Sequence, residues 1–361
     1  MSSSETPAVP VVDQSMRAQS LLTSGGGGSA RLLVDFFSRA ITTFQHSESP
    51  FQVICTLSPT ASRSPSDNAQ AHLPAPVAPR SKPKTLIVLD SSFNPPTRAH
   101  LRMATSAIHD ISGASSLGMG SLRLLLLLAI NNADKAPKPA AFHQRLAMMW
   151  AFAKDVQRRV AEDQQTAMPS EDAIYTAEGP AIDIALSTRP YFHEKSAAIA
   201  TADFYNVGST GGPTEQVILV GYDTLIRIFN PKYYGPPPAE AEVRSESGSS
   251  PSETPMQKAL GPFFARAKLR ATLRTDDEWG TSAEQRAYLD NLLHGDGLTR
   301  VGGSQEWASK IELVEGRKEG EDVVSSTYAR TAAKARDWER LDKMVTPEVR
   351  AWITKQELYC Q

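Results

Sequence analysis

Residues 84–108 constrain the fold more than any other stretch of this chain. The stretch opens with an unbroken apolar run at 86–89, which is typical of a strand buried on both faces. A polar turn with two prolines follows, and apolar residues then recur at helical spacing as far as Ile108. This order of strand, turn and helix indicates an α/β fold in which a helix N-terminus faces the end of a buried strand.

The start of this helix is suited to binding an anion. Thr97 is a good N-cap residue, and the N–H groups and dipole at a helix N-terminus attract phosphate oxygens. His100 would lie in the first turn and face an anion held there. Periodicity alone also fits any α/β protein, in which such a histidine is simply a surface residue.

From residue 84 onward, strand and helix patterns alternate. Strands are expected at 85–90, 122–130, 181–186, 216–220, 267–274 and 310–314. Helices are expected near 98–111, 141–162, 191–203, 222–229 and 281–294. Such alternation predicts a doubly wound, Rossmann-like parallel sheet with helices on both faces, and ligands bind such sheets where the strand order reverses. Strand 267–274 carries Lys268, Arg270 and Arg274, basic residues mostly at every second position, which predicts a half-exposed strand.

The composition divides the chain into four parts. Residues 1–29 are rich in Ser, Pro and Gly and are expected to be disordered, and 59–83 reads as a Pro/Ser-rich linker. Between them, 30–58 predicts an amphipathic helix and a short strand, which could dock on the main domain or on a partner. The main domain is expected at 84–361, with a flexible, proline-rich insertion at 235–260.

Charge and cysteine content exclude several classes of protein. The net charge is −2 and basic residues are dispersed, so no footprint for nucleic acid or an anionic membrane is visible. The two cysteines are far apart, which argues against a zinc site and favours a reducing compartment. The longest apolar run, 124–130, is too short to span a membrane, and no secretion signal is visible. We therefore expect a cytoplasmic or nuclear protein, with the oligomeric state left open.

The turn and helix after the first strand resemble a known signature. Ser-Phe-Asn-Pro-Pro-Thr-Arg-Ala-His-Leu-Arg-Met, residues 92–103, resembles the Gly-x-Phe-x-Pro-x-(His/Thr)-x-x-His motif of the nucleotidylyltransferase superfamily, and most closely its nicotinamide mononucleotide adenylyltransferases. The resemblance implies a catalytic role for His100 and ATP or phosphate binding by Ser92, Phe93 and Thr97. The leading glycine of the motif is Ser91 here.

A second signature lies near the other end of the chain. Val-Val-Ser-Ser-Thr-Tyr-Ala-Arg, residues 323–330, resembles the Ile-Ser-Ser-Thr-x-x-Arg motif of the same superfamily. A run of Ser and Thr caps a helix, and an arginine one turn later offers a planar fork of donors to phosphate. The resemblance implies a catalytic Arg330 and phosphate binding by Ser325, Ser326 and Thr327. The closing residues 345–359 also resemble the last helix of the family.

Two further loops follow buried strands. Lys135 and Lys138, after strand 122–130, would attract phosphates as compact charges, although a solvated loop explains them equally well. We assign Lys138 to the ATP phosphates and Lys135 to the acceptor. Gly221 and Asp223 follow strand 216–220, where glycine permits a close approach of the backbone and a carboxylate can accept ribose hydroxyls. Taken alone, this pattern also fits a turn with a helix cap, but the resemblance implies that both residues contact the nucleotide.

The resemblance implies an enzyme that transfers AMP from ATP, with Mg²⁺ carried by the ATP, to nicotinamide mononucleotide and so yields NAD and pyrophosphate. No metal site formed by protein residues is expected. The family usually stacks a tryptophan on the nicotinamide ring, and none occurs between 150 and 279, where Tyr191 or Phe192 could substitute. Another phosphorylated acceptor, CTP with a phospho-alcohol, or ATP hydrolysis therefore stays open. Ser91 keeps a non-catalytic nucleotide-binding regulator open as well.

Overall fold

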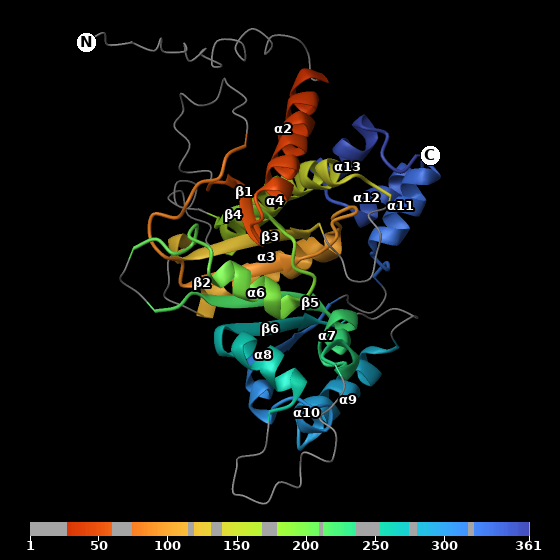
Figure 1. The fold of residues 1–361 in the computed structure, drawn as a ribbon. Helices are drawn as coiled ribbons and strands as arrows, with labels where there is room; N and C mark the ends of the chain where they lie inside the picture. The colour runs from red at the N-terminus through yellow and green to blue at the C-terminus, as the bar shows by residue number, and fades with distance from the viewer. Residues whose placement is uncertain are drawn as a thin grey trace, which may run out of the picture.

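The protein folds around one seven-stranded sheet (Figure 1). The computed structural model describes residues 27–59, 74–114, 119–130, 139–167, 179–208, 212–235, 253–273, 280–316 and 321–360. The strands are β1 (Phe51–Leu57), β2 (Thr85–Asp90), β3 (Leu122–Ala129), β4 (Ala181–Ser187), β5 (Glu215–Gly221), β6 (Ala267–Thr272) and β7 (Ile311–Val314). All six strands predicted between 85 and 314 are present, each within two residues of its expected ends.

The strand order is β1-β4-β3-β2-β5-β6-β7, and every neighbouring pair from β4 to β7 is parallel. The chain runs outward from β2 through β3 to β4 and then returns to the other side of β2 as β5. The order therefore reverses between β2 and β5, which is the topology of a doubly wound, Rossmann-like fold. The predicted fold class is confirmed, and the reversal places the carboxyl ends of β2 and β5 next to each other.

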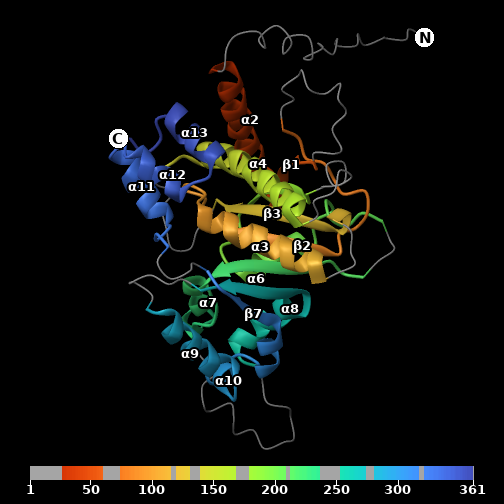
Figure 2. The same ribbon diagram turned by 180° about the vertical axis from the view of Figure 1, so that it is seen from behind.

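Helices cover both faces of the sheet (Figures 1 and 2). One face packs against α2 (Gly27–His46), α3 (Arg98–Ala114), α4 (Phe142–Ala167), α11 (Ser326–Lys334), α12 (Trp338–Met344) and α13 (Pro347–Lys355). The other packs against α6 (Phe192–Ala200), α7 (Tyr222–Ile228), α8 (Pro255–Arg266), α9 (Ser282–Leu293) and α10 (Gly297–Arg300). Along β2, Ile87 and Leu89 enter the first core, and Leu86 and Val88 enter the second. None of the described helices combines the length and apolarity needed to cross a membrane.

The N-terminal helix and strand are part of this domain. β1 pairs antiparallel with β4 at the edge of the sheet, and Phe37 and Phe44 of α2 are buried in the first core. Of the two alternatives for 30–58, docking on the domain is therefore correct. Helix α2 begins at Gly27, so residues 27–29 are helical rather than disordered as predicted. Residues 1–26 lie outside the described part of the chain.

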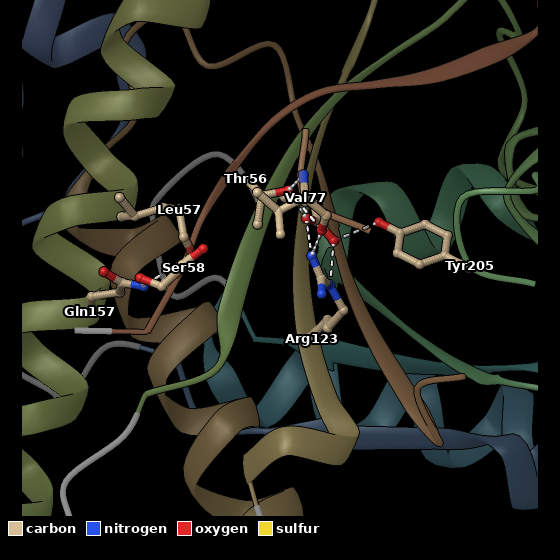
Figure 3. A network of polar contacts seen from close by, with 8 residues as sticks. Thr56, Leu57, Ser58, Val77, Arg123, Gln157 and Tyr205 are labelled. Atoms are coloured by element: carbon tan, nitrogen blue, oxygen red, sulfur yellow. Dashed lines mark hydrogen bonds and ion pairs between the residues drawn. The ribbon is translucent and has the colours of Figure 1, made fainter. Parts of the chain in front are cut away.

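A buried polar network joins this extension to the sheet (Figure 3). The Asp183 carboxylate of β4, which is completely buried, accepts hydrogen bonds from Arg123 of β3, from Thr56 of β1 and from the Tyr205 hydroxyl. Arg123 also donates to the carbonyl oxygen of Val77, and the Val77 N–H donates to the Thr56 hydroxyl. Residues 74–83 of the predicted linker are therefore attached to the sheet at Val77.

One sequence prediction is wrong and another is only partly correct in the half of the sheet that contains β6. The sequence predicts a flexible range at 235–260, but α8 begins at Pro255, behind a capping box formed by Thr254 and Gln257. Its apolar side chains, including Phe263, are buried, and this stabilises the helix. Residues 236–252 are not among those described.

The basic residues of β6 are only partly exposed as expected: the Lys268 side chain is 45% exposed, but Arg270 is buried. Arg270 is 3% exposed, because α3 covers it. The Arg270 guanidinium forms ion pairs with Asp110 of α3 and Glu312 of β7, which allow the charge to be buried.

Candidate nucleotide site

The candidate site lies at the carboxyl ends of β2 and β5, where the strand order reverses. Asp90 is the last residue of β2, and the loop 91–97 leads from it into α3. Gly221 ends β5 and is the N-cap of α7. Since β2 and β5 are paired in parallel up to Leu89 and Leu219, these two strand ends lie at the same edge of the sheet.

His100 is held by two contacts with Thr97 at the start of α3. The Thr97 N–H donates to His100 Nδ1 at 3.0 Å, and the Thr97 hydroxyl lies 2.8 Å from the same nitrogen. Thr97 occupies the predicted N-cap position, and its carbonyl accepts from the Leu101 N–H. The histidine side chain therefore does the work of the Glu or Gln in a capping box. The other ring nitrogen, Nε2, lies 3.0 Å from the Ser91 hydroxyl.

The rest of the 91–97 loop is largely buried. Phe93 is 0% exposed, and its ring lies 5.5 Å from that of His100 and 6.4 Å from that of Phe152. Its side chain therefore belongs to the core, and contact of Phe93 with a ligand is limited to its backbone. Ser92 is exposed on the loop, and the peptide bond between Asn94 and Pro95 is cis.

The second signature packs directly on this loop. The Ser326 hydroxyl donates to the carbonyl oxygen of Pro95 at 2.8 Å, across 231 positions of sequence. Arg330 Nη1 donates to the carbonyl oxygen of Asn94 at 2.9 Å, and Nη2 donates to the Thr327 hydroxyl at 3.1 Å. The two segments that carry the signatures thus lie side by side.

Ser325 and Ser326, both predicted to bind phosphate, have structural contacts of their own at the start of α11. The Ser326 hydroxyl proton is engaged with the loop, so its predicted phosphate contact is left to its backbone N–H. The side chain of Ser325 caps α11 by accepting from the Tyr328 N–H. The Ser-Ser-Thr run therefore both caps the helix and attaches it to the loop.

Two residues to which the sequence assigned no role lie near Arg330: Tyr359, which contacts Asn94, and Arg145, which interacts electrostatically with Tyr359 and Arg330. The Tyr359 hydroxyl donates to Asn94 Oδ1 at 2.7 Å. Arg145 of α4 is 5% exposed, donates from Nε to the Ala140 carbonyl and lies 5.1 Å from the Phe142 ring centre. Burial raises the pKa of the Tyr359 hydroxyl, whereas the positive charges of Arg145 and Arg330 lower it.

The two arginines form a positive cluster. Burial lowers the pKa of the Arg145 guanidinium, Tyr359 acts to raise it, and the like charge of Arg330 lowers it further. Within the described residues, neither Arg145 nor Arg330 forms an ion pair with a carboxylate. Two neighbouring guanidinium groups without a carboxylate are suited to holding an anion. Tyr359 lies within the closing residues 345–359 that resemble the last helix of the family, but no spacing rule in the sequence brings it together with Arg145.

The β5 side of the site contains Gly221 and Asp223. A Cβ atom at Gly221 would lie 2.8 Å from Asp223 Oδ1, so the absence of a side chain makes room for the carboxylate. Asp223 is half-buried in the first turn of α7. The predicted lysines, Lys135 and Lys138, lie outside the described residues.

Aromatic residues lie at the same edge, at the start of α6. Tyr191 is 36% exposed, and its ring stacks on His193 at 5.8 Å with an interplanar angle of 9°. Burial lowers the pKa of the His193 imidazole. Lys195, one turn further along α6, forms a buried ion pair with Asp90 at 2.5 Å and lies 5.2 Å from the Phe192 ring centre. Lys195 therefore links the aromatic residues to the end of β2.

A doubly wound sheet with these two motifs joined at its reversal point defines a nucleotidylyltransferase-type fold. No protein-family model matches the chain. A curated protein of Schizosaccharomyces pombe, described as "Putative nicotinamide mononucleotide adenylyltransferase", is 32% identical over 266 residues, which is 74% of this chain and 82% of that protein. The chain belongs to the nucleotidylyltransferase superfamily, and within it to the nicotinamide mononucleotide adenylyltransferase-like proteins.

Two solved structures align with this chain at low sequence identity and low TM-score. Plasmodium falciparum nicotinic acid mononucleotide adenylyltransferase complexed with NaAD is 14% identical, with a TM-score of 0.41, over 77% of this chain and 98% of that one. Thermotoga maritima TmcAL bound with alpha-thio ATP is 12% identical, with a TM-score of 0.31, over 75% of this chain and 56% of that one.

Proposed function

We propose that this protein transfers AMP from ATP to nicotinamide mononucleotide, giving NAD and pyrophosphate. The observation that carries the proposal is the contact between the two signatures, in which Arg330 of α11 donates to the carbonyl oxygen of Asn94 in the 91–97 loop. This contact places a guanidinium group beside the loop that holds His100. The relative from Schizosaccharomyces pombe supports the same chemistry.

The reaction needs no protein nucleophile. The phosphate of the acceptor attacks the α-phosphorus of ATP in line, and pyrophosphate leaves, so catalysis consists of positioning and of stabilising charge on the phosphoryl oxygens. We assign His100 to stabilising, directly or through the Ser91 hydroxyl 3.0 Å from its Nε2, the oxygens that gain charge in the transition state. Arg330, with Arg145 and the N–H groups at the start of α11, would hold the β- and γ-phosphates.

The acceptor would bind on the α6 side of the site. Phe192 or Tyr191 supplies a ring that can stack on nicotinamide in place of tryptophan. The Lys195–Asp90 ion pair supports this assignment, because it joins α6 to the strand end from which the 91–97 loop begins. Asp223, above Gly221, would accept ribose hydroxyl protons.

Magnesium would enter the site as part of the substrate, Mg–ATP. The described residues contain no group of three or more His, Cys, Asp or Glu side chains that could hold a metal ion. The side chains around the candidate phosphate site are mainly cations and hydroxyl groups, which suit phosphate oxygens rather than a resident magnesium ion. No catalytic step is assigned to the metal beyond its charge on the triphosphate.

A turnover assay tests the proposal. The purified protein is incubated with Mg–ATP and nicotinamide mononucleotide, and NAD and pyrophosphate are measured. Parallel reactions contain nicotinic acid mononucleotide, a phospho-alcohol with CTP, or no acceptor. His100→Ala should lower kcat by about 10²- to 10³-fold with a smaller change in the KM for ATP, because it removes a group that stabilises the transition state. His109→Ala is the matched control, since His109 lies on the same helix with a largely exposed side chain.

Each alternative has its own result in this assay. NAD formation that is lost in His100→Ala supports the proposal. Product formation with another acceptor would identify a transferase of different specificity, and release of phosphate without an acceptor would indicate hydrolysis. Binding of ATP without any product would show a non-catalytic nucleotide-binding protein, and equal rates for the wild type and His100→Ala would refute the role of His100.

A further inference from the structure

Ser91 is the residue at which this chain departs from the signature, which has glycine there. It follows β2 directly, and its backbone N–H donates to the Leu127 carbonyl of β3. Its side chain is half-buried and lies 3.0 Å from His100 Nε2. The hydroxyl therefore occupies the position in front of the ring nitrogen that faces away from Thr97.

The direction of this hydrogen bond follows from the other side of the ring. A backbone N–H can only donate, so the contact from Thr97 requires a lone pair on His100 Nδ1. In a neutral imidazole the proton is then on Nε2, which donates to the Ser91 oxygen. The Ser91 hydroxyl keeps its own proton, and its described contacts include no acceptor for it.

We propose that Ser91 is a further catalytic residue, whose hydroxyl accepts from His100 Nε2–H and donates its own proton to a phosphoryl oxygen of the bound nucleotide. The inference rests on the proposed function and deepens it. Thr97, His100 and Ser91 form a chain of donors, in which each bond polarises the next and so strengthens the last donor. A hydroxyl that donates to an anionic phosphate oxygen forms a short, charge-assisted hydrogen bond.

The position of Ser91 supports a ligand contact. Ligands of doubly wound sheets bind beyond the carboxyl ends of the strands at the reversal point, and Ser91 is the first residue beyond the end of β2. With glycine at this position, His100 would face the phosphate directly. With serine, the hydroxyl lies between the imidazole and the phosphate, so removal of either side chain breaks the same chain of donors.

A double-mutant cycle tests this arrangement. The kcat for NAD formation is measured for Ser91→Ala, His100→Ala and the double variant, with Ser112→Ala on α3 as the control. Ser91→Ala should lower kcat about 10²- to 10³-fold, at least as much as His100→Ala, because it removes the donor through which the histidine acts. The double variant should be no slower than Ser91→Ala alone, because the histidine acts through the serine. Circular dichroism and thermal melting check that each variant folds.

Two results would overturn the inference. If Ser91→Ala is as fast as the wild type or faster, the nucleotide displaces the hydroxyl and binds His100 directly. If the losses in the two single variants multiply in the double variant, the two side chains act independently.

A binding readout separates this inference from the proposed function. The dissociation constant for inorganic pyrophosphate is measured by calorimetry for the wild type, Ser91→Ala and Ser112→Ala. Weaker binding in Ser91→Ala alone supports the hydroxyl as a phosphate donor, even if the wild type makes no NAD. Equal dissociation constants in all three proteins would overturn the inference, even if the wild type makes NAD.

Discussion

Replacing Arg123 with methionine should destabilise the protein strongly, because it leaves a buried charge without its counterion. The Asp183 carboxylate is 0% exposed and accepts two hydrogen bonds from Arg123, at 2.8 Å from Nε and 2.6 Å from Nη2. Its other two donors, Thr56 at 2.7 Å and Tyr205 at 2.9 Å, are neutral (Figure 3). Removing one partner of a buried pair costs about 3–5 kcal/mol. The melting temperature should therefore fall by about 6–20 °C, at about 2–4 °C per kcal/mol.

Urea unfolding followed by far-ultraviolet circular dichroism measures this loss. Arg159→Met is the matched control, since Arg159 forms an exposed ion pair with Asp163, and such pairs contribute at most about 1 kcal/mol. The double variant Arg123→Met/Asp183→Leu should be more stable than Arg123→Met alone, because it removes the unpaired carboxylate. Hydrogen exchange should also quicken along β1 in Arg123→Met, since Thr56 of β1 depends on the same carboxylate.

If Arg123→Met is as stable as Arg159→Met, the unpaired Asp183 carboxylate does not carry the expected cost. If the double variant is less stable than Arg123→Met, the lost stability comes from packing rather than from an uncompensated charge. In either case the backbone pairing of β1 with β4 and the packing of its apolar side chains, rather than the ion pair, would hold β1 to the sheet.

Tyr359→Phe should lower the free energy of unfolding by about 1–3 kcal/mol, because Oδ1 of buried Asn94 loses the hydrogen bond from the Tyr359 hydroxyl, and it should also raise the KM for ATP. Tyr328→Phe is the control, since the Tyr328 side chain is exposed. An unchanged KM in Tyr359→Phe would remove Tyr359 from the site. Burial, and to a lesser extent the charge of Asp183, raise the pKa of the Cys55 thiol in the folded protein. Above about pH 8.5, the ordinary pKa of a thiol, the unfolded chain therefore loses this proton before the folded protein does. The free energy of unfolding should fall as the pH rises through this range. Cys55→Ala should make this fall shallower in equilibrium unfolding measured as a function of pH, and an equal slope would contradict the assignment.

The strands could be predicted because their signal is local. Residues 86–89 and 124–128 are continuous apolar runs, and the sheet buries them on both faces, with alternate residues in different cores. Proline and polar turns mark the ends of these strands, so the predicted boundaries are nearly correct. The α/β fold class then follows from the alternation of elements.

The failures have non-local causes. Arg270 has the sequence pattern of an exposed strand face, and only the packing of α3 against β6 shows that its charge is paired and buried. Helix α8 is hidden by its proline-rich surroundings, although the capping box at Thr254 is a local signal that could have located its start. The roles of Arg145 and Tyr359 depend on a meeting of α4 and the chain end with the 91–97 loop, which no spacing rule encodes.

The 91–97 loop of the candidate site depends on the end of the chain, chiefly through Asn94. Asn94 is 4% exposed, so its polar groups need partners within the protein. Two of those partners come from the last 35 residues, since Arg330 donates to its backbone oxygen and Tyr359 donates to its side-chain oxygen. The neighbouring carbonyl of Pro95 is likewise partnered by Ser326. The loop that presents Ser91 and His100 therefore reaches its observed position only when α11 and the C-terminal residues fold against it, which couples the phosphate site to the final segment of the chain.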